Sequence, residues 1–152
     1  MKVLIAADES EFSRSALDSV LTRPWPDTTE FLILSVVPFI PPAYGDWQLG
    51  YASSAREAQS ALNTLHHSTV LEFETEMRRA FPESRIEGKV VTGSIRDCIV
   101  DEAETWQADL IVMGSHGRTG MSRFLLGSVA ESVLGRSPCS VEIIRMPKAV
   151  NR

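Results

Sequence analysis

Short apolar runs alternate with helix-length segments along this chain, and this alternation limits the possible folds more than any other feature. The first run, "KVLIAA", is apolar at almost every position, as expected for a strand covered on both faces. Strands are predicted over residues 2–7, 31–37, 85–93, 108–114 and 140–145, and helices over 10–21, 55–81, 95–106 and 128–134. Because strands that alternate with helices form crossover units, we expect an α/β fold with a parallel sheet and helices on both faces.

The helix over 55–81 is predicted from one amphipathic stripe that ends before Pro82. Its apolar positions are Ala58, Leu62, Leu65, Phe73, Met77 and Ala80. The preceding connection, 38–54, is long for a compact domain, so it is either functional or mobile. Its Trp47 and Tyr51 could cover a ligand, contact a partner or fill a groove, and we favour the groove.

The length and composition predict one domain of an ordinary globular type. A chain of 152 residues fits a single domain over 1–147, followed by a short tail over 148–152. The net charge of −5 argues against a nucleic-acid partner, since phosphate backbones are bound by clustered cations. No apolar stretch has membrane-spanning length, and the start of the chain does not resemble a signal peptide. Cys98 and Cys139 lack metal-ligand spacing and are expected to be reduced thiols, so we expect a cytoplasmic protein.

The segment "MGSHGRTGMSRFLLGSVAES" places glycines where a strand ends and a helix begins. Gly114, Gly117 and Gly127 follow the spacing Gly-x2-Gly-x9-Gly-Ser. Glycine lets another group approach the backbone closely, and the free amides at a helix start attract anions. Ligands of parallel sheets also bind beyond the carboxyl ends of the strands. A phosphate site is therefore predicted here, although neither GxxxxGK[ST] nor GxGxxG is present.

A purely structural interpretation of the same segment stays open. Ser128 and Glu131 have the spacing of a capping box, and the first glycine could be a simple turn. A nucleotide could share such a helix start, because the other early amides remain available. Arg118 and Arg123 face either phosphates or water, and His116 is better interpreted as an ordinary polar loop residue.

Three stretches resemble the universal stress protein family: "VLIAADES", "LILSVV" and above all "VMGSHGRTGMSRFLLGSVAESVLGRSPCSVEIIR". The resemblance covers nearly the whole chain. In that family, Gly-x2-Gly-x9-Gly-[Ser/Thr] marks the members that bind ATP. The resemblance thus implies an ATP-binding member with a doubly wound, five-stranded parallel sheet in the order 3-2-1-4-5, the fold of the adenine-nucleotide alpha-hydrolase type.

The family's binding positions can be transferred to this chain residue by residue. Asp8 would lie beside the adenosine, the backbone of Val36 would recognise adenine, and Met113 would line the ribose and phosphate side. The implied binding residues are Ala7, Asp8, Val36, Met113, Gly114, Gly117, Gly127, Ser128 and Val129. A Mg or Mn ion is expected to accompany the phosphates, held mainly by phosphate oxygens and water.

Two residues depart from the pattern of ATP-binding relatives. Ala6 replaces a common proline, which loosens a turn, and Ala130 replaces a residue that often carries a hydroxyl. A hydrogen bond to a charged group is worth roughly 1.5–3 kcal/mol, so losing one weakens binding without abolishing it.

Catalysis is expected to be slow at most. Ser115, His116 and Asp8 lack the G-x-S-x-G elbow of a hydrolase, and only part of the set needed for phosphoryl transfer is visible. The leading hypothesis is an ATP-binding regulatory protein of the stress response, in which ATP is a bound signal. The alternative is a nucleotide-free dimeric interaction module. An ATP pyrophosphatase-like enzyme ranks last, because "DESEFS" stands where that class has a Ser-Gly-Gly-rich loop.

The last predicted strand, 140–145, is expected at an edge of the sheet with unpaired backbone groups. The long connection could cover this edge. The resemblance favours a homodimer, since dimers of the family form through the last strand.

Overall fold

The computed structural model describes residues 1–40, 49–117 and 126–146, with the backbone alone for 49–53. The elements follow one another as β1 (Lys2–Ala6), α1 (Glu11–Leu21), β2 (Glu30–Val37), α2 (Leu49–Ala80), β3 (Ile86–Thr92), α3 (Ile95–Trp106), β4 (Leu110–Gly114), α4 (Ser128–Arg136) and β5 (Ser140–Ile144). The strands form one five-stranded sheet in the order β3-β2-β1-β4-β5. Every pairing is parallel, so the expected fold class and strand order are confirmed.

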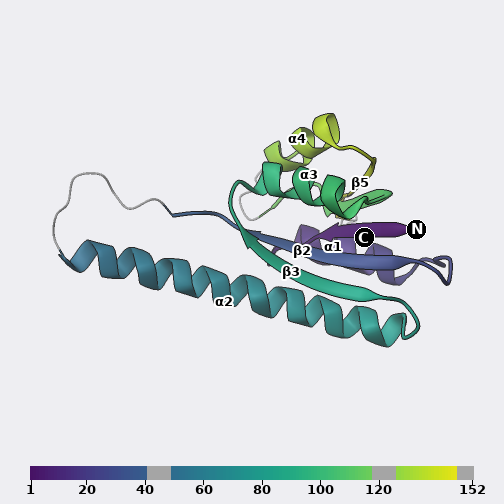
Figure 1. The fold of residues 1–152 in the computed structure, drawn as a ribbon, viewed down its shortest axis with the longest axis horizontal. Coiled ribbons are helices and arrows are strands. Elements are labelled where there is room, and N and C mark those ends of the chain that lie inside the picture. Colours follow the sequence, from purple (N-terminus) through teal and green to yellow (C-terminus); the bar gives the residue numbers. More distant parts are fainter. Residues whose placement is uncertain (41–48, 118–125, 147–152) are drawn as a thin grey trace, which may run out of the picture.

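Helices cover both faces of the sheet (Figure 1). Alternate residues of β1 point to opposite faces, as the period of a strand requires. Val3 and Ile5 pack with residues of α1 and α2, whereas Leu4 packs with residues of α3 and α4. Burial on both faces explains why the central strands are apolar at nearly every position.

The strand order reverses between β1 and β4. From β1 the chain continues to β2 and β3 on one side, and then returns to place β4 and β5 on the other. In sheets of this type a crevice opens beyond the carboxyl ends of the strands at the reversal. The turns after β1 and β4 therefore meet at this point, although their residues lie far apart in the sequence.

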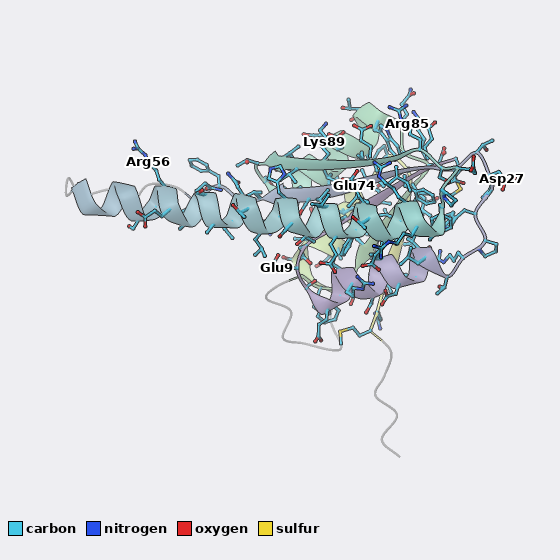
Figure 2. All side chains as sticks on the ribbon, turned by 90° about the horizontal axis from the view of Figure 1, so that it is seen from below. Glu9, Asp27, Arg56, Glu74, Arg85 and Lys89 are labelled. Carbon is cyan, nitrogen blue, oxygen red and sulfur yellow. The ribbon has the colours of Figure 1, made fainter. Side chains whose placement is uncertain are left out.

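Helix α2 differs from the prediction, because it begins at Leu49 rather than at residue 55. Its first turns extend beyond the sheet in both views (Figures 1 and 2), and Figure 2 shows Arg56 on this projecting part. Ala58 is exposed and Leu65 is 38% exposed, whereas Phe73 and Met77 are buried. Ala58 lies on the turns that extend beyond the sheet, whereas Leu65 is next to the buried His66 and so lies off the buried face of the helix, and part of the predicted stripe was therefore wrong. Trp47 and the side chain of Tyr51 lie outside the described residues.

The other helices begin and end close to the predicted positions. Ser10 caps α1 by accepting a hydrogen bond from the Ser13 amide, and α3 has the predicted bounds. No helix in the described ranges is long and apolar enough to cross a membrane. Cys98 and Cys139 carry free thiols, and the described residues hold no group of three or more metal-ligating side chains.

Candidate functional site

A cavity of about 600 Å³ lies at the carboxyl ends of β1, β2 and β4. It is lined by all of the residues that the resemblance implied, namely Ala7, Asp8, Val36, Met113, Gly114, Gly117, Gly127, Ser128 and Val129. These residues come from four separate parts of the chain, and the strand reversal brings them together. The volume falls in the range of small-molecule and cofactor sites, about 300–1,000 Å³.

The turn between β1 and α1 fixes the carboxylate of Asp8. Its Oδ1 accepts hydrogen bonds from the Ser10 amide at 3.0 Å and from the Ser10 hydroxyl. The Asp8 amide donates to Ser13 Oγ at 3.0 Å. A Cβ atom on Gly117 would lie 3.0 Å from Asp8 Oδ2. The second carboxylate oxygen therefore reaches the loop that follows β4, across the strand reversal.

Two glycines of the motif are required by close backbone contacts. A Cβ on Gly114 would lie 2.7 Å from the carbonyl carbon of Phe12, so α1 could not pack this closely on β4. A Cβ on Gly127 would lie 2.9 Å from the Ser115 carbonyl oxygen and 3.2 Å from His116 Cα. The Gly127 amide donates to that same Ser115 carbonyl at 2.8 Å. This contact fastens the start of α4 to the end of β4.

The predicted capping box at Ser128 is wrong. The N-cap of α4 is Gly127, with φ −64° and ψ 148°, and no side chain caps the helix. The Glu131 amide donates to the Gly127 carbonyl at 2.9 Å and is thus part of the helical ladder. The helix starts one residue earlier than a Ser128 cap would allow, because the Ser115 contact holds Gly127 in an extended conformation.

This start of α4 is suited to an anion. Ser128 is exposed and lines the cavity together with Val129 and Ala130, the other residues of the first turn. First-turn amides have no acceptor within their own helix, and the positive end of the helix dipole lies at the same place. Since the Ser128 hydroxyl does not cap the helix, it is available to a ligand.

The charge of the cavity lining is low. Among its described residues, Asp8 is the acidic side chain and none is Lys or Arg. His66 and His116 are the histidines that line it. Arg118 and Arg123, for which phosphate contact was one prediction, lie outside the described residues.

His116 lies in the loop that follows β4, at the α4 side of the cavity. Its Nδ1 is 3.1 Å from Ser115 Oγ, and its ring centroid is 5.0 Å from that of Phe12. Ser115 is buried and is not one of the described lining residues. This geometry does not present Ser115 to the cavity as a nucleophile.

Sequence reasoning missed several lining residues, and His66 is the most informative of them. It is 3% exposed, and its Nδ1 lies 2.7 Å from Ser35 Oγ. The Ser35 hydroxyl in turn donates to the Ala7 carbonyl at 2.6 Å. His66 precedes Val70, Phe73 and Met77 at helical spacing, so the periodicity of α2 could have found it. Apolar lining residues that were also missed are Leu34, Pro38, Ile95, Ile99 and Leu126.

Residues 1–145 match the sequence model of the universal stress protein family. The chain belongs to the universal stress protein family. A universal stress protein of Methanocaldococcus jannaschii, MJ0531, is 33% identical over 154 residues, which cover 97% of this chain and 83% of that relative.

Solved structures of the family share the fold. Protein MJ0577 of M. jannaschii superposes with a TM-score of 0.82 at 25% identity, and 97% of each chain is covered. A universal stress protein solved in complex with cAMP gives a TM-score of 0.67 at 24% identity, with 95% of this chain and 96% of that chain covered. A family member from Arabidopsis thaliana with AMP bound gives 0.65 at 18% identity, with 97% and 93% covered.

Proposed function

We propose that this universal stress protein binds an adenine nucleotide, which the glycine motif indicates is ATP, in the cavity at the strand reversal. The bound nucleotide acts as a signal in a stress response, and hydrolysis is slow at most. The observation that carries this proposal is the cavity itself, since the three glycines and Ser128 of the Gly-x2-Gly-x9-Gly-Ser motif line it together with Asp8 and Val36. The relatives solved with cAMP and with AMP support the same class of ligand.

The two ends of the cavity suit the two ends of a nucleotide. The β1 and β2 side offers apolar walls, the Asp8 carboxylate and the end of β2 at Val36, which suit a base and a ribose. The α4 side offers first-turn amides and the Ser128 hydroxyl, which suit phosphates.

A triphosphate needs more positive charge than the described lining provides. The helix dipole supplies a partial charge, and Asp8 opposes it. One carboxylate is too few for a cation site made by protein alone, so Mg or Mn would be held mainly by phosphate oxygens and water. The ion would offset the phosphate charge, and the residues of the chain would bind and orient the nucleotide.

The first test is the ligand carried by the purified protein. We expect mass spectrometry of freshly purified, denatured protein to find ATP or AMP, and calorimetry to detect heat when either is added to nucleotide-free protein. The double variant Gly127→Val, Ser128→Ala should abolish ATP binding and keep the fold, with Gly135→Ala, an open position of the same helix, as control. If ATP and AMP give no heat and nothing co-purifies, the protein is instead a nucleotide-free interaction module. Multiple turnover at about one per second or faster would refute slow hydrolysis.

We also propose a homodimer through β5, which lies at one edge of the sheet. The Ser115 amide donates to the Ile144 carbonyl at 2.8 Å, so the even-numbered residues of β5 pair with β4. Val141 and Ile143 therefore turn their amides outward, where a second copy could pair with them.

Proline at an outward-facing position removes an edge donor and leaves the ladder to β4 intact. We expect light scattering to find a dimer for the native protein and a monomer for Val141→Pro. A native protein that stays monomeric at micromolar concentration would contradict the dimer.

A further inference from the structure

We propose that Ser35 and His66 are positioning residues for the base, because they hold the Ala7 carbonyl and so leave the peptide group of Val36 for the edge of a purine. The ligand in this inference rests on the proposed function. The hydrogen-bond arrangement does not, and it can be tested without any nucleotide.

The register of β1 and β2 determines where the Val36 peptide points. The Glu30 amide donates to the Met1 carbonyl at 2.9 Å, and the Ala7 amide donates to the Leu34 carbonyl at 2.8 Å. Even-numbered residues of β2 thus direct both backbone groups toward β1. If the ladder continued by one more bond, the Val36 amide would donate to the Ala7 carbonyl.

The Ala7 carbonyl has a different partner. It accepts a hydrogen bond from Ser35 Oγ at 2.6 Å, and both residues are buried. Ala7 follows the end of β1, and the chain turns away at Asp8, whose amide donates to Ser13 Oγ. Among the described backbone contacts the Val36 amide makes no bond to this carbonyl, so the ladder ends here with the Ser35 hydroxyl as the partner of Ala7, and Val36 lines the cavity.

His66 fixes the direction of the Ser35 hydroxyl. A hydroxyl has a single proton, and here it is given to the Ala7 carbonyl, so Ser35 Oγ can only accept from His66. His66 Nδ1, at 2.7 Å, must then carry a proton. Because His66 belongs to the buried stripe of α2, packing of the helix fixes the position of its imidazole. The imidazole orients the Ser35 hydroxyl, and this hydroxyl donates its hydrogen bond to the Ala7 carbonyl.

The consequence is selectivity for the base. The peptide group of Val36 offers one donor and one acceptor toward the cavity. Adenine matches this pair, since its N1 accepts and its neighbouring amino group donates. Hypoxanthine carries a hydrogen on N1 and an oxygen in place of the amino group, so it would face donor with donor and acceptor with acceptor. A site built on hydrogen bonds rejects such an analogue strongly.

The first experiment measures amide hydrogen exchange by NMR in the nucleotide-free protein. In Ser35→Ala the Ala7 carbonyl loses its hydroxyl partner, so the Val36 amide can take its place. We expect exchange at Val36 to slow at least tenfold, while exchange at the Ala7 amide, which is bonded to Leu34 in both proteins, stays the same. Equal protection of the Val36 amide in native protein and variant would overturn the inference.

The second experiment compares the affinities for AMP and IMP by calorimetry. We expect native protein to bind AMP more tightly than IMP. In Ser35→Ala the ratio of the AMP affinity to the IMP affinity should fall about tenfold. His66→Asn keeps a donor near the position of Nδ1 and should retain the preference, whereas His66→Leu should lose it. An AMP-to-IMP ratio unchanged in Ser35→Ala and His66→Leu would refute the positioning role. If native protein bound neither nucleotide, the proposed function would fail, and the exchange result would still decide the hydrogen-bond arrangement.

Discussion

Replacing Gly127 by alanine tests the site with the smallest possible change. The backbone there has φ −64°, which alanine adopts without strain, so the effect comes from the added methyl group alone. That methyl would lie 2.9 Å from the Ser115 oxygen, about half an ångström inside ordinary contact, which begins at 3.4 Å. The two nearest atoms, Ser115 O and His116 Cα, both belong to the backbone, so the loop after β4 must move away from α4.

The cost can be estimated from this overlap. Overpacking of this kind costs about 1–3 kcal/mol, and the bond from the Gly127 amide to Ser115 is weakened as well. For a chain of this size, each kcal/mol lowers Tm by about 2–4 °C, so a fall of roughly 5 °C is expected. ATP affinity should fall about tenfold or more, because α4 and its first-turn amides move. Adenosine affinity should change little.

Gly135→Ala is the matched control in the same helix. Nothing lies within 4 Å of a Cβ at that position. Alanine favours a helix over glycine by about 1 kcal/mol, so Tm should rise by about 2–4 °C with ATP affinity unchanged. Calorimetric scans and titrations of the two variants provide the comparison. If Gly127→Ala matched native protein in both Tm and ATP affinity, the contact between α4 and β4 would not be what shapes the site.

Two further predictions concern titrating groups. Arg14 donates two hydrogen bonds to Glu76, at 2.5 and 2.6 Å, and this lowers the pKa of Glu76. A carboxylate with a lowered pKa stabilises the fold at neutral pH, and this stabilisation is lost once the carboxylate is protonated in acid. Glu76→Gln should therefore lower the free energy of unfolding by at most about 1 kcal/mol at pH 7 and leave it unchanged well below pH 4, as measured by urea unfolding. Burial raises the pKa of Cys98, and the carboxylates of Asp101 and Asp97 raise it further. Iodoacetamide at pH 8 should therefore modify Cys98 more slowly in folded than in urea-unfolded protein, and equal rates would contradict the raised pKa.

The sequence predicted the fold well because the period of its apolar residues reports directly on burial. The central strands are apolar on both faces since helices cover both, and Pro82 stops α2 where no amide donor is available. The prediction failed in part for α2. Periodicity does not show how far the sheet extends beneath a helix, so Ala58 was expected to be buried and is exposed. The buried face also runs through His66 rather than through Leu65.

For the candidate site, too, the sequence decided some features and the tertiary structure decided others. The spacing of Gly114, Gly117 and Gly127 belongs to one continuous segment, so the sequence by itself predicted a site at the end of β4, and the three glycines line the cavity there. Only the tertiary structure decided that Gly127, held by Ser115, replaces Ser128 as the helix cap. It also decided that His66 reaches Ser35 and, through it, Ala7. Such contacts depend on how a helix packs against a sheet, and residues far apart in the sequence carry no local pattern that reports this packing.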